Sequence, residues 1–307
     1  MKNCNLEADM RTLDELKTVA KNESNQIVSV ANAADMEVLK AVKAAKEEGL
    51  CSFILFGNEN EIYTLSDKVA LDLSSIKVEA EDVNPAGAAV KAVHEGEADI
   101  LMKGNVSTKA LLKAVLNKEY GLRSGKILSQ VALFEIPNQD RLLFLTDAGM
   151  NIAPTLLEKV EIINNAVKVA RGVGMDCPKV AALAAVEIVN PSMQATMDAA
   201  ILTQMQKRNQ ISDCIIDGPL AFDNAVSPLA AEQKNIHSDV AGSTDIIAVP
   251  TIEVGNALYK SFMYFADAKV ASVVSGANAP IVLTSRADSA ASKLYSLALA
   301  LVSAKKF

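Results

Sequence analysis

The sequence contains few of the residues on which the commonest catalytic sites depend. Two histidines, His94 and His237, occur among 307 residues. No GxSxG motif accompanies them, which disfavours a Ser-His-Asp hydrolase. No GxGxxG follows the first strand-like run and no GxxxxGK[ST] is present, which disfavours a dinucleotide-binding site and a P-loop. The four cysteines are far apart and form no CxxC pair, so we expect neither a zinc site nor a disulfide framework.

An excess of basic charge and long hydrophobic runs are absent as well. The formal net charge is −7, which predicts no general affinity for nucleic acid or anionic membranes. The apolar runs are strand-sized or interrupted by charges, and the first residues lack the apolar core of a signal peptide. We therefore expect a cytoplasmic protein that binds neither nucleic acid nor membrane. An anionic substrate needs a local basic site in such a chain.

Short apolar runs alternate with longer helix-like segments along the chain. Hydrophobic residues make up 50% of the sequence, enough for a large core. In the last helix-like segment, Leu294, Leu297 and Leu301 share one helical face. Near-continuous apolar strands separated by helices are typical of mostly parallel sheets covered by helices, so we predict an α/β fold. The predicted strands are residues 27–31, 53–56, 99–102, 131–136, 141–145, 179–184, 214–216, 245–249, 269–274 and 281–283.

Several helix ends are marked by cap residues, prolines and glycines. Asn84 precedes Pro85, a combination that favours a helix start. Gly49 and Gly96 follow helix-like segments, as glycines do at helix ends. Pro137 and Asn138 break the chain after residues 131–136, and we interpret this break as a crossing into a second domain.

The first candidate site is the segment from Lys103 to Lys109, which follows a strand and opens a helix. Gly104 permits close approach of the backbone, and the helix start at Ser107 and Thr108 supplies unpaired N–H groups. Together with Lys103 this arrangement favours an anion site. An ordinary strand-to-helix turn with a Ser/Thr cap explains the same residues.

The second candidate is the loop of residues 121–126, followed by Ser129 at the head of a strand. Its cations Arg123 and Lys126 and the hydroxyl of Ser124 suit a phosphate group. A solvated loop with incidental charges is the alternative.

The third candidate follows the apolar residues 214–216. Asp217 and Asp223 are expected at the carboxyl end of a strand, where open α/β sheets place their sites, with Phe222 between them. Turns rich in Asp, Gly and Pro are also common for structural reasons. No cluster of His or carboxylates at ligand spacing supports a metal, so we expect none.

The fourth candidate is the strand exit at Ser285 and Arg286, with Asp288 in the first turn of the last helix. Arg286 suits a phosphate and Ser285 suits a tetrahedral oxyanion. A helix cap beside a surface charge is the alternative explanation.

Five blocks of sequence, taken in order, resemble the phosphate acetyl/butyryltransferase family. The blocks are IVSVANAADMEVLKAV, LMKGNVSTKALLKAVL, IIDGPLAFDNAVSP, DVAGSTDIIAVPTIEVGNALYKSF and APIVLTSR. The motifs LAFDNA and IVLTSRAD resemble those of the butyryltransferases more than the LQFDAA and VNDLSRG of the acetyltransferases.

The resemblance implies a fold, an activity and an assembly. It implies two α/β domains similar to those of isocitrate and isopropylmalate dehydrogenases, residues 1–136 plus 293–307 and residues 137–292, with the site in the cleft. The last helix is expected to pack on the N-terminal domain. The implied reaction is the reversible transfer of an acyl group, butanoyl above all, between coenzyme A and inorganic phosphate, with acyl phosphate as product. It implies no cofactor and no metal. It also implies a homo-oligomer, either a dimer or a larger assembly.

The resemblance also suggests roles for individual residues. Ser285 and Arg286 match family residues that stabilise the transition state and hold the phosphate. Arg123, Lys126 and Ser129 fall in the loop where acetyltransferases bind phosphate, at a different spacing. The acetyltransferases carry a base aspartate seven positions after the serine, where this chain has Ser292. Asp288, one helical turn earlier, and Asp223 are the alternative bases.

Other functions stay open at this point. Acetyl or broader short-chain specificity differs from the butanoyl one only in the shape of a pocket. A decarboxylating dehydrogenase of the same fold requires a metal and a nicotinamide cofactor. A non-catalytic acyl-CoA-binding regulatory protein binds CoA esters without phosphate-dependent turnover.

Overall fold

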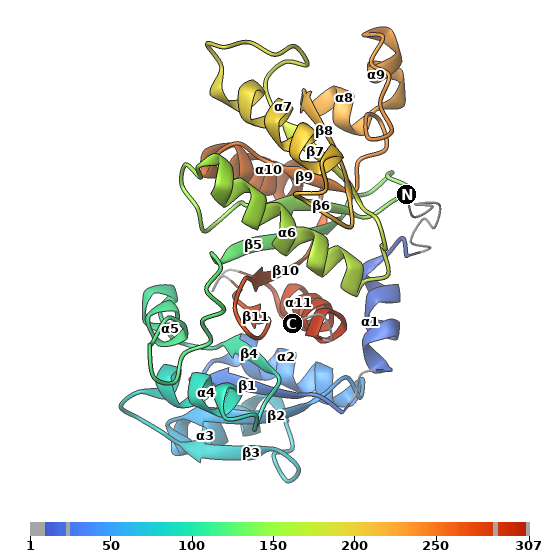
Figure 1. Ribbon diagram of the computed structural model, residues 1–307. Coiled ribbons are helices and arrows are strands. Elements are labelled where there is room, and N and C mark those ends of the chain that lie inside the picture. Colours follow the sequence, from blue (N-terminus) through green and yellow to red (C-terminus); the bar gives the residue numbers. More distant parts are fainter. Residues whose placement is uncertain (1–9, 23–24, 285–287, 305–307) are drawn as a thin grey trace. The chain divides into compact units, whose positions relative to one another are not determined.

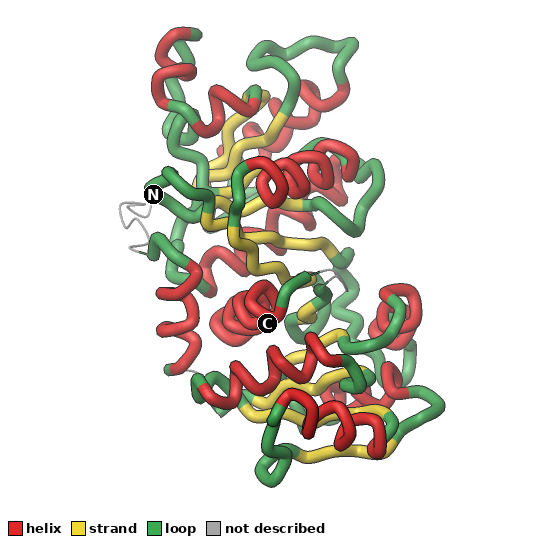
Figure 2. The backbone as a smooth tube through the Cα atoms, turned by 180° about the vertical axis from the view of Figure 1, so that it is seen from behind, coloured by secondary structure: helices red, strands yellow, loops and turns green. Residues whose placement is uncertain are grey.

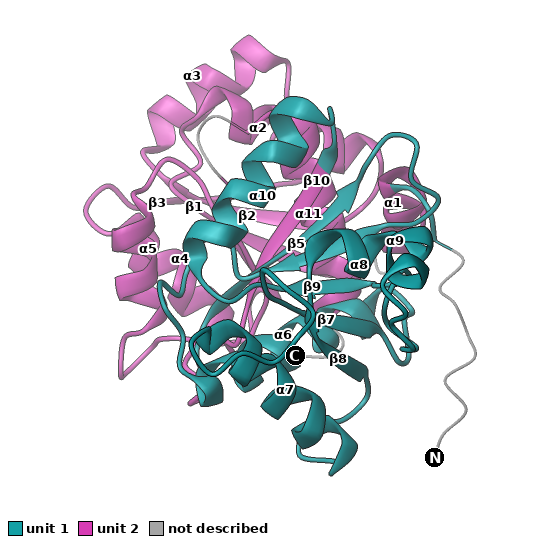
Figure 3. Cartoon of the chain, turned by 90° about the horizontal axis from the view of Figure 1, so that it is seen from above, with its two compact units in different colours: residues 1–12, 127–269, 306 teal, residues 13–126, 270–305, 307 magenta. Residues whose placement is uncertain are grey.

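The computed structural model describes residues 10–22, 25–284 and 288–304. These residues form two compact units (Figure 3). Unit 1 is built from residues 127–269 with the described residues before Leu13, and unit 2 from residues 13–126 and 270–304. Both contain strands and helices, so the predicted α/β class is confirmed.

Unit 2 alternates strands and helices along most of its length. Its strands are β1 (Ile27–Ala31), β2 (Ser52–Gly57), β3 (Lys77–Ala80), β4 (Ile100–Lys103), β10 (Lys269–Ser275) and β11 (Ile281–Val282). They lie in the order β3-β2-β1-β4-β11-β10, and all neighbours are parallel except β10 and β11. Its helices are α1 (Leu13–Lys21), α2 (Met36–Glu47), α3 (Glu59–Val69), α4 (Pro85–His94), α5 (Thr108–Val115) and α11 (Ala290–Ala304).

The last helix completes the core of unit 2. Helix α11 packs against α1 and α2 and lies beside β4 and β11 (Figure 1). Leu294, Leu297 and Leu301 are buried on it, as their spacing predicts. The last helix thus packs on two helices from the first part of the chain.

Unit 1 carries the remaining strands and helices. Its strands are β5 (Ser129–Glu135), β6 (Leu143–Thr146), β7 (Lys179–Leu183), β8 (Ile215–Leu220) and β9 (Ile246–Ala248). They lie in the order β5-β6-β9-β7-β8, and only β5 and β6 pair antiparallel. Its helices are α6 (Leu156–Gly172), α7 (Gln194–Lys207), α8 (Phe222–Val226), α9 (Pro228–Gln233) and α10 (Ile252–Phe265). Figure 2 shows the strands of each unit flanked by helices.

The division between the units differs from the predicted one at both places where the chain crosses. The turn at Pro137 and Asn138 connects β5 to β6, which pair as a hairpin, with Ala132 opposite Leu145. Because β5 pairs with β6, the crossing into unit 1 comes earlier, at residue 127. The return comes at residue 270, because β10 and β11 pair into the sheet of unit 2.

The predicted helix boundaries agree with the structure. The side chain of Asn84 accepts a hydrogen bond from Gly87 N (3.1 Å), and Pro85 begins α4. Gly49 and Gly96 follow α2 and α4 with positive φ angles of 68° and 78°, a conformation that favours glycine. The cap chemistry of the sequence therefore sets where these helices begin and end.

Two expected absences concern membrane-spanning helices and disulfides. Among the described residues, no helix is long and apolar enough to cross a membrane. Cys177 is disulfide-bonded, against the expectation of a chain without disulfides, whereas Cys51 and Cys214 are free.

The exits of β1 and β4 cross at very close range in unit 2. Gly104 N donates to Ala31 O (2.9 Å), and Asn105 N donates to Asn32 O (2.7 Å). A Cβ atom on Gly104 would lie 2.1 Å from Asn32 O, well inside contact distance. Only glycine fits here without a backbone shift.

We predict that Gly104→Ala lowers the free energy of unfolding by about 3 kcal/mol, because two backbone segments must move apart. Chemical unfolding followed by circular dichroism measures this. Gly125→Ala is the matched control, since a Cβ there meets no atom within 4 Å and only its positive φ costs about 1 kcal/mol. A loss at Gly104 no larger than at Gly125 would contradict the close-approach explanation.

Candidate functional site

The carboxyl end of β4 joins a buried lysine to an exposed helix start. Lys103 is 6% exposed, and its Nζ donates to Gly104 O (3.3 Å). Ser107 caps α5, since its Oγ accepts from Ala110 N (3.1 Å), and Thr108 is the first helical residue. The cap explanation of Ser107 is therefore confirmed, and the anion site at this helix start stays a prediction.

The loop of residues 121–126 is exposed and tied down by its backbone. Leu122 N donates to Val115 O (2.8 Å), and Gly121 O lies 3.1 Å from Nδ1 of His94. Ser124 Oγ donates to Gly276 O, so its proton serves the loop rather than a ligand. The exposed side chains of Arg123 and Lys126 remain the candidate phosphate cations.

These two candidates lie at opposite ends of the same strand. Leu101 N donates to Pro280 O (3.2 Å), which places the residues before β11 where β4 begins. The loop 121–126 contacts these residues through Asn278, whose N donates to Leu122 O. Lys103 lies where β4 ends. Within unit 2, the structure does not place the two predicted anion sites at one edge of the sheet.

The described part of the last candidate motif is its final residue. Ser285 and Arg286 lie outside the described residues. Asp288 is half-buried, and its backbone O accepts a hydrogen bond from Nζ of Lys293 (2.5 Å), a side chain that is 3% exposed. Ser292, at the position of the acetyltransferase base, donates its N–H to Ser289 Oγ (3.2 Å). Lys293 is a buried cation that the motif analysis did not single out.

The motif at residues 217–223 differs from its predicted geometry. Strand β8 continues to Leu220, so Asp217 lies within the strand rather than at its carboxyl end, and its Oδ1 accepts from Gly218 N (2.9 Å). Phe222 begins α8 and packs against Phe262 with ring centroids 6.1 Å apart. Asp223 is the residue of this motif that follows the strand, as predicted.

Asp223 belongs to a surface network of charges. Its side chain is 57% exposed and lies 3.8 Å from Nζ of Lys234. Lys234 also pairs with Glu187 (3.0 Å), and this contact lowers the pKa of the Glu187 carboxyl. A paired and exposed carboxylate of this kind has little of the burial that tunes a general base.

Ser129 is buried, unlike an exposed phosphate ligand. Its side chain is 0% exposed, and its Oγ accepts a hydrogen bond from Nδ2 of Asn165 (2.9 Å). Asn165 also donates to Ile127 O (3.0 Å), and Asn151 donates to Leu128 O (2.9 Å). Ser129 thus anchors the start of β5 within unit 1.

A buried carboxylate at the end of β6 escaped the motif analysis. Asp147 is 3% exposed and accepts hydrogen bonds from Gly149 N (2.9 Å), Met150 N (3.0 Å) and Nδ2 of Asn151 (2.6 Å). Burial raises the pKa of Asp147, and these hydrogen bonds oppose the rise only in part. Its sequence context reads as a plain turn, so no pattern signalled the burial.

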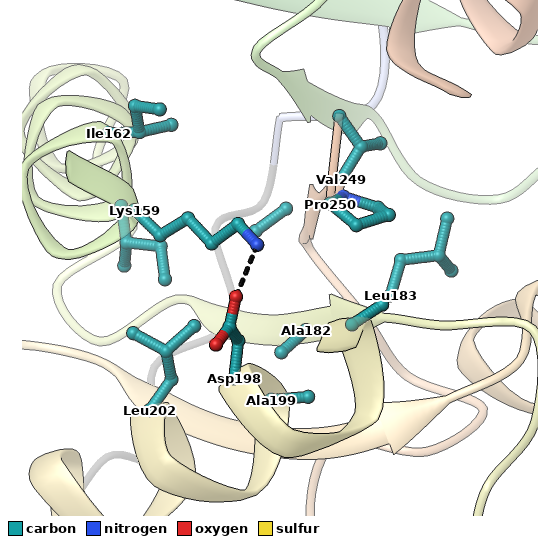
Figure 4. Close-up of a pocket in the computed structure, with 12 residues that line it drawn as sticks. Lys159, Ile162, Ala182, Leu183, Asp198, Ala199, Leu202, Val249 and Pro250 are labelled. Atoms are coloured by element: carbon teal, nitrogen blue, oxygen red, sulfur yellow. Dashed lines mark hydrogen bonds and ion pairs between the residues drawn. The ribbon is translucent and has the colours of Figure 1, made fainter. Parts of the chain in front are cut away.

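A second missed feature is an ion pair in a small pocket at the carboxyl ends of β7 and β9 (Figure 4). Nζ of Lys159 on α6 lies 2.6 Å from Oδ2 of Asp198 on α7, and these side chains are 11% and 8% exposed. Gln194 Nε2 donates to the other carboxylate oxygen (2.7 Å). The apolar walls, which include Ile162 and Leu202, enclose about 20 Å³, room for about one water molecule.

Asp147, Asp223 and the Lys159–Asp198 pair therefore lie at the carboxyl ends of parallel strands of unit 1, the edge where α/β sheets place ligand sites. No group of three or more potential metal ligands occurs among the residues that the structure describes.

Comparison with known proteins decides the family. The family model described as "Phosphate acetyl/butaryl transferase" matches residues 11–87 and 78–301. The chain belongs to the phosphate acetyl/butyryltransferase family. It is 54% identical over 295 residues to the "Probable phosphate butyryltransferase" of Bacillus subtilis (strain 168), covering 96% of this chain and 99% of that one. The predicted family membership and the transferase class are thus confirmed.

Other members of the family carry different specificities in their names. The "Phosphate acetyltransferase" of Thermotoga maritima is 45% identical over 291 residues, with 94% of this chain and 99% of that one covered. The solved structure of a "branched-chain phosphotransacylase" from Enterococcus faecalis V583 is 37% identical, with a TM-score of 0.81 over 91% of this chain and 99% of that one. Membership of the family therefore does not determine which acyl group is transferred.

The predicted likeness to dehydrogenases holds for the fold. A solved 4-hydroxythreonine-4-phosphate dehydrogenase from Klebsiella pneumoniae matches 91% of this chain with a TM-score of 0.55 and 11% identity.

We predict that Asp198→Ala lowers the free energy of unfolding by about 3–5 kcal/mol, because it leaves the Lys159 ammonium buried without its partner. Chemical unfolding measures the loss. The double variant Lys159→Met with Asp198→Leu removes both charges and should recover most of it. A single variant within about 0.5 kcal/mol of wild type would show that the pair does not hold α6 against α7.

Proposed function

We propose that the protein catalyses butanoyl-CoA + phosphate = butanoyl phosphate + CoA, reversibly and by direct transfer in a ternary complex. The observation that carries the proposal is the 54% identity, over nearly the whole of both chains, to the probable phosphate butyryltransferase of Bacillus subtilis. A "Phosphate butyryltransferase" of Clostridium acetobutylicum, 46% identical over 294 residues, supports the same acyl group, butanoyl. The motifs LAFDNA and IVLTSRAD, read as closer to the butyryltransferases, agree with it.

The reaction needs positioning and charge stabilisation more than covalent chemistry. A phosphate oxygen attacks the thioester carbonyl carbon, a C–O bond forms, and the C–S bond breaks as CoA leaves as a thiolate that takes up a proton. Holding both substrates in attack geometry supplies much of the rate. Donors aimed at the oxyanion of the tetrahedral intermediate supply another part, about 2.7–4 kcal/mol for each donor. In this proposal the reaction requires no cofactor and no metal.

The proposal assigns roles to the candidate residues of each unit. In unit 2, Arg123 and Lys126 bind phosphate, Lys103 and the start of α5 at Ser107 bind anionic groups of the CoA ester, and Ser285 with Arg286 stabilises the oxyanion and holds phosphate. Asp288 is the proposed base. It is half-buried, whereas Asp223 of unit 1 is exposed and ion-paired.

Acetyl specificity is the second candidate. It is supported by the 45% identity to the Thermotoga maritima phosphate acetyltransferase. Discrimination of one methylene in an apolar pocket is worth only about 1–3 kcal/mol. Several short-chain CoA esters should therefore react at graded rates.

We also propose that the chain forms a homo-oligomer. Helix α10 ends in Tyr264 and Phe265, which are 76% and 90% exposed. Two adjacent exposed aromatic rings are typical of a surface that another subunit covers. A monomeric mass in analytical ultracentrifugation at micromolar concentration would refute this. The cytoplasmic location stays a prediction.

We predict phosphate-dependent thiol release that is fastest with butanoyl-CoA among the acetyl, propanoyl, butanoyl and hexanoyl esters, with no metal added. Release is followed with an aromatic disulfide reagent. The thiols of Cys214 and Cys51 should contribute little to the signal, since burial raises the pKa of Cys214 to about 12 and also raises that of Cys51.

The control is the same assay without phosphate. An acetyl optimum would move the assignment to phosphate acetyltransferase. No phosphate-dependent release from any ester would refute the proposed reaction.

A further inference from the structure

Four contacts within unit 2 tie the loop 121–126 to the residues that lead into β11. Asn278 N donates to Leu122 O (2.8 Å), and Nδ2 of Asn278 donates to Arg123 O (3.1 Å). Arg123 also forms an isolated antiparallel bridge with Ala277, and Ser124 Oγ donates to Gly276 O. Residues 122–124 of the loop are thus held by residues 276–278.

Asn278 makes two of these four contacts. It is exposed at the surface of unit 2, whereas its neighbours Ala277 and Ala279 are buried at 3% and 6% exposure. The buried neighbours fix its backbone, and the fixed backbone aims its side-chain amide at the carbonyl of Arg123.

The effect of this clamp falls on Arg123. Its backbone lies in the isolated bridge opposite Ala277, its carbonyl accepts from the Asn278 amide, and its side chain is exposed. No ion pair of Arg123 with another described residue is present. A guanidinium on a fixed backbone loses less freedom on binding an anion than one on a mobile loop.

We propose that Asn278 is a positioning residue for phosphate, acting through Arg123. This deepens the proposed function and rests on it for the identity of the anion. The amide of Asn278 holds the Arg123 carbonyl, so the guanidinium is ready to bind inorganic phosphate with two parallel N–H···O bonds. Asn278 itself does not touch the substrate.

The residues that hold the loop lie just before β11. Three residues after Asn278, β11 begins and pairs with β4, with Ile281 opposite Leu101. The strand then leads through Thr284 to residues 285–286. The clamp therefore fixes the loop against the residues that lead into β11, at the end of the strand opposite Thr284.

The test is the steady-state kinetics of Asn278→Ala and Asn278→Asp. Loss of one hydrogen bond to the loop should raise the KM for phosphate about three- to tenfold in the alanine variant. The aspartate variant should raise it more, because a carboxylate oxygen then faces the Arg123 carbonyl. The kcat at saturating phosphate and the KM for butanoyl-CoA should stay within about twofold of wild type.

A double-mutant cycle separates positioning from a general structural role. If Asn278 acts through Arg123, the effects of Asn278→Ala and Arg123→Ala on the KM for phosphate are not additive, and the double variant resembles Arg123→Ala alone. Asn58→Ala is the matched control. Asn58 is also an asparagine of unit 2, and its Oδ1 caps α3 by accepting from Glu61 N (2.9 Å), so its loss should leave both KM values unchanged.

Each outcome of these measurements either supports or overturns the positioning role of Asn278. An unchanged KM for phosphate in Asn278→Ala, or additive effects in the cycle, would overturn the positioning role. A parallel rise of both KM values with a fall in kcat would also overturn it, because the residue would then be structural. Titration calorimetry with inorganic phosphate alone gives a readout besides turnover. If wild type shows no phosphate-dependent thiol release but Asn278→Ala still weakens phosphate binding, the proposed reaction is refuted. The positioning role of Asn278 is then supported independently of that reaction.

Discussion

The pairing of β11 with β4 is the interaction on which the organisation of unit 2 depends. Two residues, Ile281 and Val282, lie parallel to Leu101 and Met102 in the middle of the unit's strand order. This pairing brings β10, β11 and α11 onto a layer of strands formed much earlier in the chain. It also fixes both ends of the β11 segment. Asn278 at one end reaches the loop 121–126, and Thr284 at the other leads to the proposed oxyanion donors.

The net charge of the chain bears on how its exposed cations and its ion-paired carboxylates are arranged. With a net charge of −7, the protein repels CoA esters and phosphate at long range. In the proposed function, binding therefore comes from short-range contacts of cations such as Arg123, whose carbonyl is held by Asn278. Carboxylates near the sheet edge of unit 1 are neutralised locally instead, Asp198 by Lys159 and Glu187 by Lys234.

The sequence predicted features that depend on local chemistry, and the structure bears them out. The cap at Asn84, the glycine after α2 and the apolar face of α11 are each set by a few neighbouring residues. The domain crossing was misplaced because the turn at Pro137 looks the same in a hairpin and in a linker, and only strand pairing distinguishes them. The burial of Ser129 and the pairing of Lys159 with Asp198 were missed for a related reason. Each joins residues more than thirty positions apart, so no local pattern carries them.

The division of the chain has a consequence for the order in which the protein is made. All helices and strands of unit 1 come from one continuous segment, residues 127–269, whereas those of unit 2 come from two segments, one on each side of it. Because domains fold as their segments leave the ribosome, unit 1 has all of its strands before unit 2 has its last two. Until β11 arrives, one side of β4 presents unpaired backbone groups, and such edges invite pairing with other chains. This free edge of β4 therefore persists while the whole of unit 1 is being synthesised.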